Sequence, residues 1–260
     1  MNRRILSISI MALWGAFSSG CQTPAVNGIT QVATIDALLA GVYDGHTSLE
    51  TLRRHGDFGI GTFAGLDGEM VLLDGRFYQI RSDGKVYQPP LSDRTPFACV
   101  TTFVPDRSES ITSRTDMKAL QERIDTLAPG QNSFCTFIVR GVFSHVRVRS
   151  VPAQTKPYRP LAEVTKNQPV FILSKIRGAL IGFRSPSFVK GVNVPGYHIH
   201  FLADDLSGGG HILEFELTQG LLEADTVHEW LNIYLPSESV SFGAADLTQE
   251  RSKELEGVEK

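Results

Sequence analysis

The sequence predicts an α+β fold, a two-domain α/β chain with mostly antiparallel β-sheets and a few helices. Short strand-like runs alternate with turn signals, and Asp-Gly pairs at 67–68, 74–75 and 83–84 are typical of hairpin turns. Clear helical spacing of apolar residues is confined to a few stretches. The long strand–helix alternation of a doubly wound parallel sheet is absent, so we expect antiparallel sheets.

Length and composition set the broad class of protein. The chain has 260 residues, of which 42% are hydrophobic and 20% are charged, and its formal net charge is -3. These values indicate a globular chain that is long enough for one large domain or two modest ones. No dense run of Lys or Arg gives a basic surface, so we expect no nucleic-acid partner.

Local patterns define the elements of the first half. Apolar residues recur at helical spacing over 35–42, and residues 67–89 have the turn punctuation of a strand meander. The clearest helix is predicted over 117–127, where apolar residues lie on one side and Gly130 follows the end. We interpret residues 28–152 as an N-terminal β-rich domain.

The second half continues with strands and ends in a helix. Strand-like runs begin at residue 132, and residues 151–169 carry four prolines, which is typical of an irregular connection. This connection is the predicted domain boundary. Further strands follow over 170–223, and the charged stretch 247–260 is prone to form a helix. We interpret residues 153–260 as a C-terminal metal-binding domain.

Residues 1–21 have the layout of an export signal, with the features of a bacterial lipoprotein signal. A short basic start is followed by an apolar run over 5–17 and by small residues that end in Cys21. The run is too short for a comfortable membrane span. We predict a secreted, periplasmic or lipid-anchored protein, with a lipid on Cys21 as its one route to a membrane. An unused signal would leave the protein cytoplasmic. Cys99 and Cys135 are predicted to be buried thiols rather than a disulfide.

Three histidines gather near residue 200. Side chains two apart in a strand share a face, so His198 and His200 point the same way. A glycine-rich turn follows over 204–210, and a hairpin there would bring His211 to that face. Three imidazoles suit Zn²⁺ or a similar divalent ion and leave one coordination position open for a substrate. The pattern therefore predicts a catalytic metal site.

The histidine spacing alone leaves several metalloenzymes open. An H-x-H pair followed by acids and a glycine turn is also found in cupins, and Asp204 and Asp205 stand near the position of the cupin acid. A hydratase of the carbonic-anhydrase kind would also use three histidines on zinc. The sequence on either side of the histidines distinguishes between these classes of metalloenzyme.

Long motifs around the histidines resemble those of the bacterial α-acetolactate decarboxylase family, in the same order along the chain. They are GTFAGLDGEMVLLDGRFYQIRSDGKV, TPFACVTTF, VRSVPAQTKPYRPL, GALIGFRSPSFVKGVNVPGYHIHFLADDLSGGGHIL and ADLTQ. The resemblance runs from about Ile35 to the C-terminus. It implies a two-domain α/β fold, a homodimer, and conversion of the small molecule 2-acetolactate to (R)-acetoin and CO₂ on a zinc ion.

The resemblance also implies roles for single residues. The family's zinc ligands match His198, His200 and His211. Its other active-site residues match an arginine, two glutamates and a threonine, which are Arg149, Glu69, Glu259 and Thr62. The second glutamate is assigned on the closing GVEK, and Glu256 and Glu254 are its alternatives.

These residue types fit the chemistry of a decarboxylation. Loss of CO₂ from 2-acetolactate leaves an enediolate, which a zinc ion stabilises as a Lewis acid. Arg149 would hold the carboxylate, and Glu69 or Glu259 would protonate the carbon. Two other functions stay open: a cupin-like three-histidine metalloenzyme, such as an oxygenase or lyase, and a non-catalytic exported lipoprotein that binds a ligand.

Overall fold

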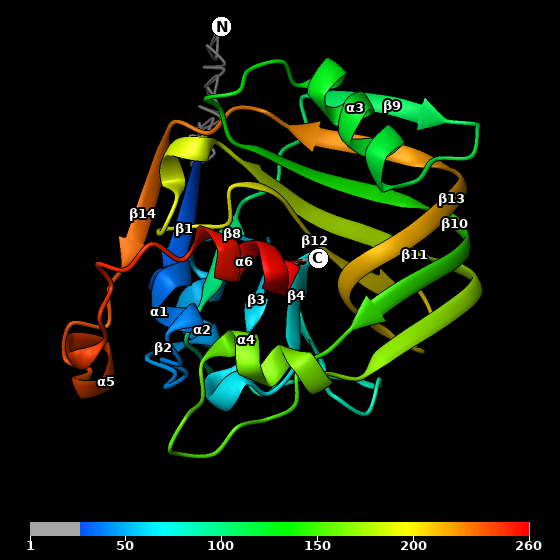
Figure 1. Ribbon diagram of the computed structural model, residues 1–260. Coiled ribbons are helices and arrows are strands. Elements are labelled where there is room, and N and C mark those ends of the chain that lie inside the picture. Colours follow the sequence, from blue (N-terminus) through cyan, green and yellow to red (C-terminus); the bar gives the residue numbers. More distant parts are fainter. Residues whose placement is uncertain (1–26, 260) are drawn as a thin grey trace, which may run out of the picture.

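Two β-sheets form the framework of the protein, whose computed structural model describes residues 27–259 (Figure 1). The first sheet has seven strands, and only its edge pair β1–β14 is parallel. In spatial order its strands are β14 (Trp230–Tyr234), β1 (Gly28–Val32), β8 (Ala98–Thr101), β3 (Phe58–Thr62), β4 (Glu69–Leu73), β5 (Arg76–Ile80) and β6 (Val86–Tyr87).

The second sheet has five antiparallel strands, three of which are long. In order they are β10 (Cys135–Arg149), β11 (Val170–Ser185), β12 (Gly196–Ala203), β13 (Gly209–Asp225) and β9 (Arg107–Ile111). Strand β10 pairs with both β11 and β13, so four strands form a closed ring of pairings. A separate two-stranded ribbon joins β2 (Thr47–Ser48) to β7 (Arg94–Thr95). The antiparallel α+β class is confirmed.

Helices are few and short. They are α1 (Ile35–Leu39), α2 (Leu49–Arg53), α3 (Met117–Leu127), α4 (Leu161–Val164), α5 (Val240–Ala244) and α6 (Ser252–Glu259). The expected helix over 117–127 is confirmed as α3, and the Asp116 side chain caps it by accepting a hydrogen bond from the backbone N–H of Ala119. The predicted helical tail is confirmed as α6.

Local turn chemistry explains the meander in the first sheet. Asp74 and Gly75 connect β4 to β5 with φ values of 50° and 74°, which a two-residue hairpin of this kind requires. Strands β10, β11 and β13 are longer than the mostly short strands that the sequence predicts, with 15, 16 and 17 residues. Each of these three strands runs without a turn along the closed ring of paired strands.

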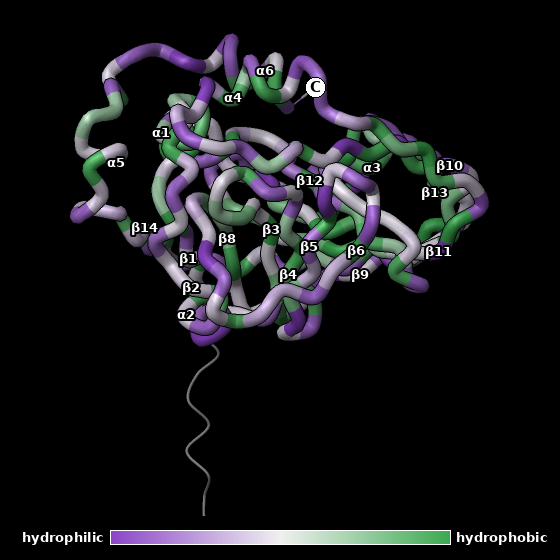
Figure 2. Tube along the Cα trace, turned by 90° about the horizontal axis from the view of Figure 1, so that it is seen from below, coloured by the Kyte–Doolittle hydropathy of each residue, from purple (hydrophilic) through white to green (hydrophobic). Residues whose placement is uncertain are grey.

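The site lies where the two sheets meet. Strands β3 and β4 of the first sheet face β11, β12 and β13 of the second, and buried apolar side chains from both sheets fill the space between them. Helix α6 lies in front of the strands of the first sheet in Figure 1 and contacts α4. The chain between β14 and α6 runs outward around α5 before it returns, as Figure 2 shows.

The sequence also made predictions about the cysteines, the N-terminal segment and the domain boundary. Cys99 and Cys135 are buried free thiols, as predicted. The export signal over residues 1–21 and the lipid on Cys21 lie outside the described residues. No helix among the described residues is long and apolar enough to cross a membrane. A domain boundary after residue 152 stays a prediction.

Candidate active site

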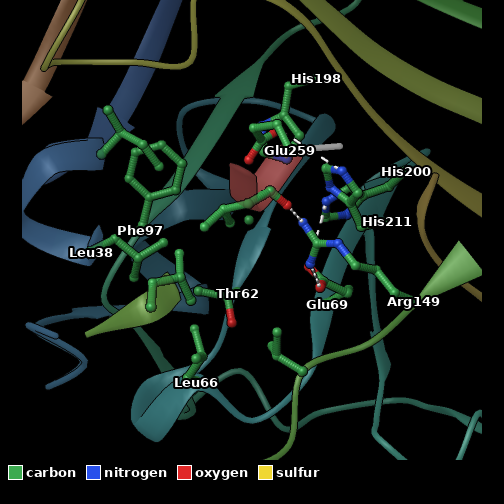
Figure 3. A pocket seen from close by; sticks show the side chains of 15 residues that line it. Leu38, Thr62, Leu66, Glu69, Phe97, Arg149, His198, His200, His211 and Glu259 are labelled. Carbon is green, nitrogen blue, oxygen red and sulfur yellow. Dashed lines mark hydrogen bonds and ion pairs between the residues drawn. The ribbon is translucent and has the colours of Figure 1, made fainter. Parts of the chain in front are cut away.

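One buried cavity brings together the three predicted metal ligands and the four other predicted active-site residues. Its volume is about 40 Å³. The predicted site residues that line it come from six elements and converge as Figure 3 shows. They are Thr62, Glu69, Arg149, His198, His200, His211 and Glu259.

Strand register places most of these side chains. Thr62 lies directly opposite Glu69 in the β3–β4 pair, and Arg149 lies opposite His211 in the β10–β13 pair. His200 lies opposite His211 across the predicted β12–β13 hairpin. Residues that face each other across antiparallel strands project to the same side. The strand register of the two sheets therefore directs the side chains of these three pairs into the same cavity.

The three histidines are close enough to share one ion. One ring nitrogen from each of His198, His200 and His211 lies within 4.8 Å of the other two. The ring centroids are 5.1 to 5.5 Å apart. Each residue is at most 9% exposed. Bulk water therefore has little access to these nitrogens.

Burial keeps the imidazoles neutral. It lowers the pKa of His198 to about 3, with a smaller contribution from the charge of Arg149. The pKa values of His200 and His211 lie well below the usual 6.5 for the same first reason. His200 Nδ1 donates to the carbonyl oxygen of Met70 at 2.9 Å, which leaves the lone pair of Nε2 directed into the cavity.

This donor set fits a zinc ion. His200 Nε2 is buried and makes no hydrogen bond within residues 27–259. Neutral imidazole nitrogens are ordinary zinc ligands, and three of them leave room for a further ligand. The carbonyl oxygen of Met70 orients the His200 ring. Metal-binding histidines usually have such a hydrogen-bond partner on the ring nitrogen that does not bind the metal.

Arg149 contacts Glu69 and the residue that precedes Glu259. Its Nη1 donates to Glu69 Oε1 at 3.2 Å, and its Nη2 donates to the carbonyl oxygen of Val258 at 2.9 Å. The Val258 contact joins the last turn of α6 to β10. Glu259 follows directly, with Oε2 3.8 Å from His211 Nε2. A single guanidinium thereby holds β4 and α6 at one cavity.

Both carboxyl groups can gain and lose a proton near neutral pH. Burial raises the pKa of Glu69 from 4.5 to about 7, although the Arg149 charge opposes this rise. Burial raises the pKa of Glu259 from 4.5 to about 7 in the same way. Acids with pKa values near the working pH are suited to proton transfer.

Thr62 supports the turn that precedes Glu69. Its Oγ1 donates to the carbonyl oxygen of Gly68 at 2.7 Å. Gly68 has a φ of 85°, and a Cβ there would lie 2.2 Å from the carbonyl oxygen of Ile80. Only glycine fits this position. The turn and the threonine together fix the start of β4, and with it the Glu69 side chain.

The alternatives from the sequence fall elsewhere. Glu254 pairs with Arg251 at 2.7 Å on the side of α6, and Glu256 lines a separate outer cavity. Glu259 is therefore the one of the three candidate glutamates that lines the histidine cavity. Asp204 and Asp205, the acids considered for a cupin-like site, lie exposed in the turn after β12.

Sequence reasoning missed the apolar wall of the cavity. This wall faces the histidines and the arginine, as the labelled Leu38, Leu66 and Phe97 show in Figure 3. Apolar residues in a sequence predict a core, and nothing in their spacing distinguishes a cavity wall from packed interior. The apolar lining residues are Ile35, Leu38, Leu66, Phe97, Val151, Leu161 and Val258.

Known proteins are similar to this chain in sequence and fold. The family described as "Alpha-acetolactate decarboxylase" matches residues 29–249. The Alpha-acetolactate decarboxylase of Methanosarcina mazei is 46% identical over 230 residues, which is 88% of this chain and 79% of the relative. The one from Bacillus subtilis is 36% identical, over 93% and 94% of the two chains.

A solved structure of the Bacillus subtilis alpha-acetolactate decarboxylase superimposes with a TM-score of 0.86. It shares 36% identity and covers 89% of this chain and 99% of its own. The comparisons place the protein among the carboxy-lyases. It belongs to the alpha-acetolactate decarboxylase family. The match of residues 29–249 stops before α6, so Glu259 is placed by the geometry of the cavity.

Proposed function

We propose that this protein decarboxylates 2-acetolactate to (R)-acetoin and CO₂ with a zinc ion held by His198, His200 and His211. One observation carries the proposal: a single cavity joins three neutral histidines to a buried arginine and two glutamates with raised pKa values. The family membership supports the same reaction.

The histidines would supply the Lewis acid of the reaction. A zinc ion bound by them would withdraw electron density from the substrate oxygen on which negative charge develops. The protein's part is to keep the three imidazoles unprotonated and to exclude water, and both follow from their burial. A water-poor site also strengthens every charge interaction within it.

Arg149 positions the substrate carboxylate. The guanidinium is always charged, and its planar fork matches a carboxylate. As the C–C bond breaks, its electron pair stays on the substrate and CO₂ leaves uncharged. The negative charge moves to the enediolate, which remains beside the arginine. The same side chain thus serves the substrate and the intermediate.

A glutamate completes the reaction by protonating carbon. The enediolate takes up one proton and becomes acetoin, so one substrate anion and one proton give acetoin and CO₂. Glu69 and Glu259 both carry a proton for part of the time near pH 7. They approach the cavity from β4 and α6, so a proton from one of them reaches one face of the carbon. This selectivity gives a single acetoin enantiomer.

The test is product formation by the full chain. Purified protein is incubated with racemic 2-acetolactate before and after chelation, and acetoin and CO₂ are measured together with the acetoin enantiomer. Activity that stops with chelator and returns with Zn²⁺ supports the proposal. Folded, zinc-loaded protein that yields no acetoin above the uncatalysed rate would overturn it.

A homodimer is a second proposal, which the edge of the seven-stranded sheet supports. No described strand pairs with the outer side of β14. Large apolar side chains on and after this strand are exposed, including Trp230, Ile233, Tyr234 and Leu235. An open apolar edge can pair with its copy about a two-fold axis. Sedimentation equilibrium should show a dimer that Ile233→Lys weakens, and a monomeric wild type would refute the proposal.

Export is a third proposal, and it rests on the sequence of residues 1–21. We expect cells that express the full chain to hold it outside the cytoplasm. Fractionation and intact-mass measurement test this, and the mass also reports a lipid on Cys21. An uncleaved protein confined to the cytosol would contradict export.

A further inference from the structure

Two cavities meet at the end of α6. The inner cavity holds the proposed reaction and has a volume of about 40 Å³. A second, outer cavity has a volume of about 600 Å³. Within residues 27–259, His211 and Glu259 line both cavities, and the two share no further lining residue. The last turn of α6 is therefore the partition between a small buried site and a large outer space.

The inner cavity is too small for the substrate as it stands. A water molecule needs roughly 10–15 Å³ of such space, so the cavity has room for about three waters. The substrate 2-acetolactate has nine non-hydrogen atoms. Some part of the wall must therefore move before the substrate can reach the histidines.

Helix α6 is the part of the wall that is held least. Most of the other lining residues lie on hydrogen-bonded strands. Helix α6 has eight residues, and only Leu255 and Val258 are buried. Two hydrogen bonds join its last turn to the second sheet: Arg149 Nη2 donates to the carbonyl oxygen of Val258, and His211 bonds to the backbone of Glu259. Few anchors make local opening inexpensive.

We propose that the outer cavity is the access chamber of the active site and that the last turn of α6 is its gate. The proposal rests on the proposed function, because it concerns how a small 2-hydroxy-3-keto acid reaches the same site. The chamber lies between α6, α3 and the strands that carry the histidines. Its walls include Met117 and Gln121 from α3, Tyr197 and Ile199 from β12, and Ser252 and Leu255 from α6.

The chamber wall opposite α6 is fixed. Tyr197 Oη donates to Asp125 Oδ1 at 2.6 Å and lies 3.1 Å from the carbonyl oxygen of Gln121. These contacts join α3 to β12. Motion that connects the two cavities is therefore concentrated in α6 and not in the opposite wall.

Gate movement would couple access to chemistry. Glu259 and Val258 stand in the wall of the inner cavity, so opening withdraws the carboxyl group from the histidines. Closing returns it and excludes water at the same moment. The two candidate proton donors, Glu69 and Glu259, therefore face the histidines together only after the substrate is enclosed.

The chamber is tested by filling it from α3, away from the histidine strands. Met117→Trp and Gln121→Trp place a large ring in the chamber, whereas Lys118→Trp is the matched control on the exposed side of the same helix. We expect kcat/KM for 2-acetolactate to fall about tenfold in the first two variants and to stay unchanged in the control. Zinc content and circular dichroism should match the wild type in all three.

The gate is tested by two substitutions with opposite effects. A Cβ at Gly257 would meet nothing within 4 Å, so Gly257→Ala stiffens α6 without a clash. Leu255→Ala removes a buried anchor. Amide hydrogen exchange of α6 should slow up to about fivefold in the first variant and quicken in the second.

The outcomes separate this proposal from the proposed function. Wild type that makes no acetoin refutes the proposed function, while the exchange rates still report on the gate. If the wild type is active and the α3 tryptophan variants match Lys118→Trp in kcat/KM, the access chamber is wrong. Equal exchange of α6 in wild type, Gly257→Ala and Leu255→Ala would refute the gate.

Discussion

Arg149 Nη1 lies 3.2 Å from Glu69 Oε1, at a position where both side chains are less than one-tenth exposed. The two residues are distant in the sequence and come from different sheets. Their contact joins the sheets at the site and keeps a positive charge beside the histidines. The first two predictions concern these two residues: the loss of the Arg149 guanidinium and the raised pKa of Glu69.

Replacing Arg149 with lysine should remove most of the activity. Lysine keeps the charge but lacks the planar fork that reaches Glu69, Val258 and a substrate carboxylate together. We expect kcat/KM to fall by roughly 10² to 10³, as for loss of one preorganised donor. Steady-state kinetics measures the fall, and an Arg147→Lys variant on the exposed face of β10 is the control. Equal rates for the two variants would contradict the role of Arg149.

Glu69 should make the stability of metal-free protein depend on pH. Its pKa is raised from 4.5 to about 7, so its contribution is fully present below pH 4.5 and is lost as the pH rises through 7. The shift corresponds to about 3 kcal/mol. Urea unfolding of wild type and Glu69→Gln at pH 5 and pH 8 measures it.

The comparison with Glu69→Gln isolates this group. The buried histidines have lowered pKa values and change stability in the opposite sense, losing their contribution as the pH falls below about 6.5. They are present in both proteins, so their effect cancels in the difference. If both proteins lose the same stability between pH 5 and pH 8, the raised pKa of Glu69 is wrong.

Removing one histidine should abolish tight zinc binding. His198→Ala leaves two imidazoles, too few for a stable site. Zinc should raise the Tm of the wild type and leave the Tm of the variant unchanged, because a ligand stabilises only the state that binds it. His145→Ala, at an exposed position on β10, is the matched control. A zinc-dependent Tm rise in His198→Ala would exclude these residues as the ligand set.

Gly210 should tolerate no side chain. It has a φ of 136°, and a Cβ there would lie 2.3 Å from the carbonyl oxygen of Arg149. Gly196 also has a positive φ, 83°, but a Cβ there meets nothing within 4 Å. Gly196→Ala therefore reports the backbone cost alone, about 1 kcal/mol.

Gly210→Ala should cost at least about 2 kcal/mol more than Gly196→Ala, because β13 must shift away from β10. The shift would also move His211 away from Arg149, so zinc affinity should fall. Chemical denaturation and zinc titration of both variants measure these effects. Equal destabilisation by the two substitutions would refute the close approach of β13 to Arg149.

Local sequence signals predicted the parts of the fold and site that depend on neighbours in the chain. The H-x-H pair and His211 could be placed on one face because a hairpin has period-two geometry and a glycine turn. Apolar spacing and Gly130 past its end placed α3. Glu69, Arg149 and Glu259 needed the family resemblance, because an isolated charged residue gives no sign of burial.

Long-range pairing could not be predicted. Strand β14 returns from the end of the chain to pair in parallel with β1, and the pairing of β10 with both β11 and β13 closes the second sheet. Alternation within a strand reports which face is buried, but it does not report which strand lies next to it. The outer cavity depends on where α6 lies relative to α3 and β12, so it had no sequence signal either.

The two halves of the site also differ in when they can form. The three histidines belong to one hairpin, whose closure costs little chain entropy, whereas Glu69, Arg149 and Glu259 meet them only through contacts between distant segments. The histidine half of the site therefore needs only a local turn to form, whereas the acid–base half needs the completed contacts between the two sheets and α6.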